Sequence, residues 1–173
     1  MEQVMEWIRG EAWKESELLE VLYDAFCVGD AAGIEQQFTA YLKKTISIRD
    51  TAVRKELKKN FYRAENCYRN FQVGVLLGLL SHRKEWSVRS NVESGDGYSD
   101  ILVKIGEEEI GIVIEMKYPD GGDLEAGCLE ALEQIEKKHY REALDLEEME
   151  KLIFVGIACE RKRCRVMTRV EQI

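Results

Sequence analysis

The chain has 173 residues, of which 45% are hydrophobic and 34% charged, and its net charge is −8. This length suits one domain with a sizeable core, and the composition is typical of a soluble protein. No apolar run approaches the roughly 20 residues of a membrane span, and the acidic N-terminus lacks a signal-peptide pattern. We therefore expect a cytoplasmic protein without a membrane partner.

The charge is unevenly distributed along the chain. Residues 93–150 carry 5 basic and 18 acidic groups, whereas residues 49–92 carry 10 basic and 4 acidic groups. A strongly anionic chain binds nucleic acid poorly without specific contacts. The basic blocks at 49–92 and 161–169 can still form a local basic surface if the fold brings them together.

The five cysteines are an odd number and include no Cys-x-x-Cys pair. The sequence therefore predicts neither a disulfide framework nor a zinc site. Cys67 and Cys128 lie in helical apolar patterns and are expected to be small core residues.

Helical spacing of apolar residues predicts three helices at the start of the chain, over residues 17–28, 33–44 and 60–81. Alternating residues then predict a strand over 86–92 and a hairpin over 98–105 and 110–117. The last predicted elements are a helix begun by Asp123, a buried strand and an exposed strand, over residues 123–145, 152–158 and 164–170.

The order α-α-α-β-β-β-α-β-β predicts an α/β fold, a mixed sheet of about five strands with helices on both faces. The helix between the third and fourth strands favours a parallel pair at that point. We divide the chain into a helical extension or linker, residues 1–59, and a domain that carries the sheet, residues 60–173.

The predicted hairpin places two acids together. If it closes symmetrically about Glu107 and Glu108, the numbers of facing residues sum to 215, and Asp100 lies opposite Glu115. Strand side chains alternate between faces, so Asp100, Glu115 and Lys117 share one face while the reverse face is apolar.

Two carboxylates at such short separation repel each other when both are ionised, and each raises the pKa of the other. A divalent cation between them removes this repulsion. Carboxylate oxygens are ligands that Mg²⁺ prefers, usually one or two with waters completing the octahedron. The neighbouring lysine can orient a water or offset charge on a phosphate. The alternative is a solvated strand face that carries a salt bridge, as most such alternations are.

Five short stretches occur in order on the predicted elements. They are Glu65-Asn66-Cys67-Tyr68, residues 93–100 (Glu-Ser-Gly-Asp-Gly-Tyr-Ser-Asp), Ile114-Glu115-Met116-Lys117, Gln134-Ile135 with Tyr140, and Val155-Gly156-Ile157-Ala158. In this order the chain resembles the PD-(D/E)XK nuclease superfamily over residues 61–170. It is similar in particular to the nuclease-like C-terminal domain found behind AAA-ATPase-like regions in bacterial proteins.

The resemblance implies a restriction-endonuclease-like fold in which Asp100 and Glu115 hold Mg²⁺ or Mn²⁺ and Lys117 helps the attacking water. It also implies that Glu65 completes the metal site and that Gln134 reaches it from the crossover helix. The alternatives are a salt bridge for Glu65 and a helix-surface amide for Gln134. The arginine that the family usually has before its acidic residue is absent from Gly97-Tyr98-Ser99-Asp100.

Two functions follow as hypotheses. The first is a Mg²⁺-dependent nuclease that hydrolyses phosphodiester bonds of DNA or RNA. The second is a non-catalytic nuclease-fold module, dimeric and associated with an AAA-type ATPase, which the net charge and the missing arginine favour. The intact Asp100, Glu115 and Lys117 favour the first.

Overall fold

The computed structural model describes residues 16–45, 61–94, 97–137 and 149–173, except for the side chains of residues 16, 17, 45, 61–70, 91–94, 97–99 and 120. The described elements run in chain order as α2 (Ser16–Val28), α3 (Ala31–Thr45), α4 (Phe61–Leu80), β1 (Trp86–Ser94), β2 (Gly97–Ile105), β3 (Ile110–Lys117), the 3₁₀ turn η3 (Asp120–Gly122), α5 (Leu124–Lys137), β4 (Lys151–Glu160) and β5 (Arg163–Gln172). The predicted order of helices and strands is confirmed. The predicted crossover helix is confirmed as far as residue 137, and its predicted residues 138–145 lie outside the described part of the chain.

The five strands form one mixed sheet in the order β1-β2-β3-β4-β5. Neighbouring strands are antiparallel except β3 and β4, which are parallel and joined through α5. The parallel pair expected from the crossover helix is therefore confirmed. The β2–β3 pairs run from Ile105–Ile110 to Ile101–Ile114, and their numbers sum to 215 as the hairpin register predicted.

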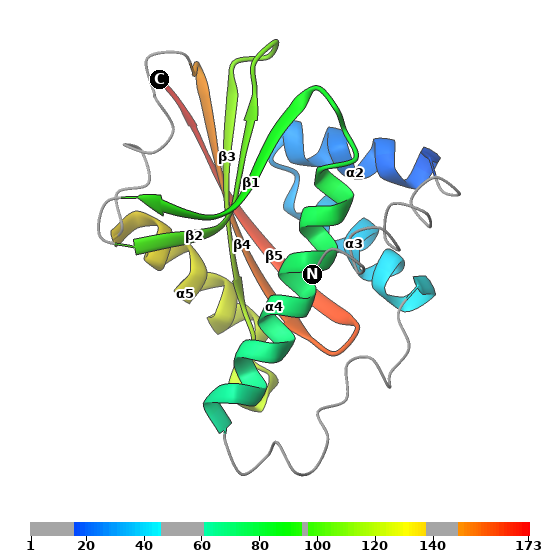
Figure 1. The fold of residues 1–173 in the computed structure, drawn as a ribbon, viewed down its shortest axis with the longest axis vertical. Coiled ribbons are helices and arrows are strands. Elements are labelled where there is room, and N and C mark those ends of the chain that lie inside the picture. The colour runs from blue at the N-terminus through cyan, green and yellow to red at the C-terminus, as the bar shows by residue number, and fades with distance from the viewer. Residues whose placement is uncertain (1–15, 46–60, 95–96, 138–148) are drawn as a thin grey trace.

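Helices cover both faces of this sheet, as the order of elements in the sequence predicted (Figure 1). Helices α2, α3 and α4 lie on one side, where they form the larger core with inward residues of β2, β3 and β4 such as Ile101, Ile114 and Val155. Helix α5 lies on the other side over a smaller cluster that includes Leu102, Val113 and Ile135, among others. The two faces thus differ in the amount of apolar surface that they bury.

One local feature sets where α5 begins, and another sets how closely it approaches the sheet. The carboxylate of Asp123 accepts a hydrogen bond from the amide of Ala126 at 3.0 Å, so Asp123 caps the helix as predicted. Gly156 of β4 lies directly beneath the helix, where an added Cβ would stand 2.6 Å from the carbonyl oxygen of Cys128. Only a residue without a side chain allows α5 to approach β4 this closely.

The cysteine prediction was wrong for one pair. Cys159 and Cys164 face each other across the β4–β5 ladder and form a disulfide, with 4.2 Å between their Cα atoms. They lie at equal distances from the turn at Arg161 and Lys162, a symmetry that a search for Cys-x-x-Cys spacing overlooks. Cys128 is buried with no exposed surface, as predicted, whereas the side chain of Cys67 lies outside the described part.

The described helices include none that is both long and apolar enough to cross a membrane.

Candidate active site

Backbone pairing between β2 and β3 ends at Ile101 and Ile114, and the next residue of β2, Asp100, contacts β3 through its side chain. One residue beyond the Ile101–Ile114 pair, Oδ2 of Asp100 accepts a hydrogen bond from the backbone amide of Met116 at 2.8 Å. The Asp100 side chain is only 5% exposed. This bond fixes its carboxylate beside β3, at the level of Glu115.

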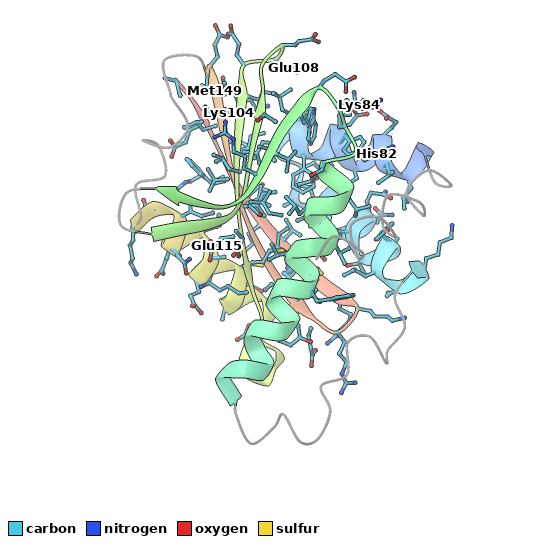
Figure 2. All side chains as sticks on the ribbon, viewed as in Figure 1. His82, Lys84, Lys104, Glu108, Glu115 and Met149 are labelled. Carbon is cyan, nitrogen blue, oxygen red and sulfur yellow. A yellow bond between two sulfur atoms is a disulfide. The ribbon has the colours of Figure 1, made fainter. Side chains whose placement is uncertain are left out.

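Glu115 lies on the face of β3 that α5 covers, and none of its surface is exposed. Figure 2 shows this residue near the middle of the sheet, beside α5. Its Oε1 accepts a hydrogen bond from Nε2 of Gln134, one turn after the buried Ala131 of α5. The interpretation of this face as solvated is therefore wrong for Glu115, because the helix excludes water from it.

Lys117 reaches the same group of side chains from the end of β3. Its Nζ donates a hydrogen bond to Oε1 of Gln134 and lies 3.9 Å from Oε1 of Glu115. A second ion pair joins Nζ to Glu130 of α5 at 3.3 Å. Since the Lys117 side chain is only 17% exposed, these contacts restrict the position of its ammonium group.

The amide of Gln134 suits its place between two charged groups. An ammonium group can only donate hydrogen bonds and an ionised carboxylate can only accept them, whereas an amide does both. Gln134 therefore links Lys117 to Glu115 with its oxygen toward the lysine and its nitrogen toward the glutamate. The close packing of α5 at Gly156, which pairs with Glu115 in the sheet, brings the amide within reach.

Three of the five predicted site residues thus contact one another on the α5 face of the sheet: Glu115, Lys117 and Gln134. A fourth, Asp100, lies on the neighbouring strand β2 and is bonded to the backbone of β3 at Met116. The fifth, Glu65, belongs to α4, but its side chain lies outside the described part, so its role as a ligand stays a prediction. Sequence reasoning missed Glu130. It stands four residues before Gln134 on one helix face, and that spacing was the available signal.

The donor set suits a hard divalent cation. The described residues contain no group of three or more His, Cys, Asp or Glu side chains that could hold a metal. Mg²⁺ needs no such cage, because it is usually held by one or two carboxylates while waters fill its other positions. Asp100 and Glu115 supply two carboxylates on the same face of adjacent strands, each held by a hydrogen bond, and this donor chemistry fits such an ion.

Together, a five-stranded mixed sheet between helices and acids on two adjacent antiparallel strands, β2 and β3, define a restriction-endonuclease-like α/β protein. The family model of the PD-(D/E)XK nuclease superfamily matches residues 63–169, so the chain belongs to this superfamily. A search among curated proteins finds no match to the chain.

Proposed function

We propose that the protein is a Mg²⁺- or Mn²⁺-dependent nuclease that hydrolyses phosphodiester bonds of DNA or RNA. The observation that carries this proposal is the fully buried carboxylate of Glu115, which shares the amide of Gln134 with the ammonium group of Lys117. A buried charge is unfavourable unless partners compensate it. Membership of a nuclease superfamily supports a catalytic reason for this arrangement.

Each residue has a distinct part in the proposed reaction. Asp100 and Glu115 would hold the ion, with Glu65 as the further ligand that the sequence suggests. The bound ion would polarise the phosphodiester group and acidify a water. Lys117 orients the attacking water, whose oxygen bonds to phosphorus as the bond to the leaving sugar oxygen breaks. The water gives up a proton to solvent, and the leaving sugar oxygen takes one up. Its ammonium group also stabilises the negative charge that develops on the phosphate.

Gln134 is a positioning residue in this proposal. By bonding both charged groups it holds the ammonium of Lys117 at a fixed place relative to the Glu115 carboxylate. Its neutral amide can do so without adding a charge to the buried site.

The first prediction concerns the two carboxylates. We expect wild-type protein to cleave single- or double-stranded DNA or RNA with Mg²⁺ or Mn²⁺ and to be inactive in EDTA. Asp100→Asn and Glu115→Gln should each lower the rate by roughly a hundredfold or more, because a preorganised charged group is lost. Cleavage is followed on labelled oligonucleotides of each type.

The matched control is Glu133→Gln, which neutralises an exposed carboxylate next to Gln134 on α5. The Glu133 carboxylate forms an ion pair with Lys137 at 3.2 Å. This variant should cut like wild type. Equal cleavage by wild type, Asp100→Asn and Glu115→Gln would refute the site assignment.

Thermal unfolding with increasing Mg²⁺ separates the nuclease from a non-catalytic module. A ligand that binds only the folded state stabilises it, by about 2.7 kcal/mol at a hundredfold excess over its Kd. We expect this stabilisation in wild type and in Glu133→Gln, and its loss in Glu115→Gln. If wild type gains no stability from the ion and cleaves nothing, the non-catalytic module becomes the better hypothesis.

A further inference from the structure

The turn between β4 and β5 carries three consecutive basic residues, Arg161, Lys162 and Arg163. Glu160 and Arg163 form the last pair of the ladder, so Arg161 and Lys162 are the two residues of the loop itself. Arg163 binds Glu160 at 2.7 Å. Residues 160–163 together carry a net charge of +2, and Arg161 is exposed at the tip of the turn. We refer to residues 161–163 as the basic turn.

The backbone of the basic turn is unfavourable for an arginine. Arg161 has φ of 55°, in the left-handed region that glycine and asparagine adopt readily and that other residues rarely occupy. Two-residue hairpin loops usually place Gly, Asn or Asp at such positions. An arginine there keeps a long cationic side chain at the expense of local backbone preference, and such outliers gather at functional positions.

Two hydrogen bonds hold the basic turn in place. The amide of Arg161 donates to Oη of Tyr118 at 2.8 Å, and its carbonyl oxygen accepts from Nε2 of Gln72 at 3.0 Å. Gln72 is a polar residue of α4 that is only 2% exposed, and Tyr118 directly follows Lys117. The turn is therefore attached to the strand end that carries the candidate active site, and to α4 (Figure 1).

The basic turn also lies within reach of the site along a nucleic-acid strand. Lys117 pairs with Ala158 of the parallel strand β4, and Arg161 follows three residues later. At about 3.3 Å per strand residue, this separates the two levels by roughly 10 Å along the strand. Successive phosphates of one strand are about 3.4 Å apart along a B-DNA axis, so a substrate strand that runs parallel to β4 would span this distance in a few nucleotides.

We propose that the basic turn binds the phosphodiester backbone of the substrate a few nucleotides from the bond that is cut, with Arg161 and Lys162 donating to phosphate oxygens. The inference rests on the proposed nuclease function. It supplies phosphate contacts that the sequence lacks before Asp100, where Tyr98 and Ser99 stand and no arginine is present. The guanidinium of arginine suits this role because it binds phosphate through two parallel hydrogen bonds.

The test is binding without cleavage. Fluorescence anisotropy of labelled single-stranded DNA, double-stranded DNA and single-stranded RNA is measured in EDTA at several salt concentrations. For Arg161→Gln/Lys162→Gln we expect affinity to fall about tenfold or more for every sequence. The slope of log K against log salt should decrease by roughly 1.4 to 1.8, because two phosphate contacts are lost. The arms show whether DNA or RNA carries the effect.

The matched control is Lys84→Gln/Lys137→Gln, which removes the same charge from two exposed lysines elsewhere. Figure 2 shows Lys84 just past the C-terminal end of α4, away from the basic turn. Lys137 is the last residue of α5. This control should bind nearly as wild type does. Equal weakening by both double variants would overturn the inference, because net charge alone would then explain the binding. Unchanged binding by Arg161→Gln/Lys162→Gln would overturn it as well.

A single variant guards against misfolding. Arg161→Gly removes the cation and also relieves the left-handed backbone, so its melting temperature should equal or exceed that of wild type while binding weakens. Unchanged binding by this variant would overturn the inference.

Failure of this inference is distinguishable from failure of the proposed function. Mg²⁺-dependent cleavage that Glu115→Gln abolishes can persist when the basic turn proves irrelevant. If wild type binds none of the three nucleic acids, the inference falls, and cleavage then decides the proposed function by itself.

Discussion

The two faces of the sheet differ in the kind of side chains that they bury. The face toward α2, α3 and α4 buries a continuous apolar core that includes Phe26, Phe38 and Ile114. The face toward α5 buries a smaller apolar cluster, and beside it lie Glu115 and Gln134. Apolar burial provides most of the favourable free energy of folding, whereas a buried carboxylate opposes it. The comparison suggests that the larger core stabilises a sheet whose other face carries the polar site.

The largest effect on stability is expected from the larger core. Phe38 of α3 has no exposed surface, and Phe38→Ala should lower the free energy of unfolding by about 3–5 kcal/mol, because it removes apolar contacts and leaves a cavity. Urea unfolding followed by circular dichroism measures this change. Val21→Ala, at a residue of α2 that is 49% exposed, is the control and should change stability far less. A loss below 1 kcal/mol for Phe38→Ala would contradict the division between the faces.

A smaller effect is expected where α5 meets the sheet. Gly156→Ala would place a methyl group against the carbonyl of Cys128, and we expect a loss of about 1–3 kcal/mol from overpacking. Because Gln134 lies on the displaced helix, nuclease activity should fall more than stability implies. Activity measured well below the melting temperature separates the two effects. Full activity in a destabilised Gly156→Ala would show that the position of α5 does not control the site.

Gln134→Leu tests the α5 face with an uncharged side chain that cannot form hydrogen bonds. It removes the link between Lys117 and Glu115, and we expect activity to fall roughly tenfold to a hundredfold, as is typical when an outer partner of a metal site is lost. Stability should change by about 1–2 kcal/mol, because buried charged groups lose a hydrogen-bond partner. The control is Leu129→Ala, at a residue of α5 that is 48% exposed. Unchanged cleavage by Gln134→Leu would remove this residue from the site.

The smallest effect concerns a hydroxyl group in the larger core. Tyr23 donates a hydrogen bond to the carbonyl of Leu79 at 2.9 Å, and burial, reinforced by Glu20, raises the pKa of Tyr23 to about 12. The folded state thus favours the neutral phenol. Its contribution to stability is complete below pH 10 and is lost as pH rises toward 12.

Tyr23→Phe should therefore cost about 1 kcal/mol at neutral pH and show a weaker decline in stability between about pH 10 and 12 than wild type does. Urea unfolding across this range measures both. Identical pH profiles for the two proteins would show that the phenol does not titrate with folding.

Much of the fold could be predicted because its signals are local. The switch from helical to alternating spacing located the strands, and the symmetric loop at Glu107 and Glu108 gave the register that the structure confirms. That register placed Asp100 and Glu115 at one level, since side-chain direction in a strand follows from residue number alone. The superfamily model that matches residues 63–169 covers both of these strands.

Other features of the site depend on contacts between distant segments. Glu115 is shielded from water because α5 packs over β3. The distance between α5 and the sheet is set by Gly156, which belongs to β4. Glu130 and Gln134 are 13 and 17 residues from Lys117, and helix spacing alone does not show which face of α5 meets the sheet. The role of Glu65 stays a prediction.

The sequence by itself determined the types and order of the elements, the hairpin register and the common face of the two acids, because these follow from backbone periodicity and loop length. Only the tertiary structure decided that Gln134 links Lys117 to a buried Glu115, that Cys159 bonds to Cys164, and that Tyr118 and Gln72 hold Arg161 beside the strand end of the site. Such contacts arise when packed elements approach each other at specific angles and distances. Residue spacing along one chain does not specify them.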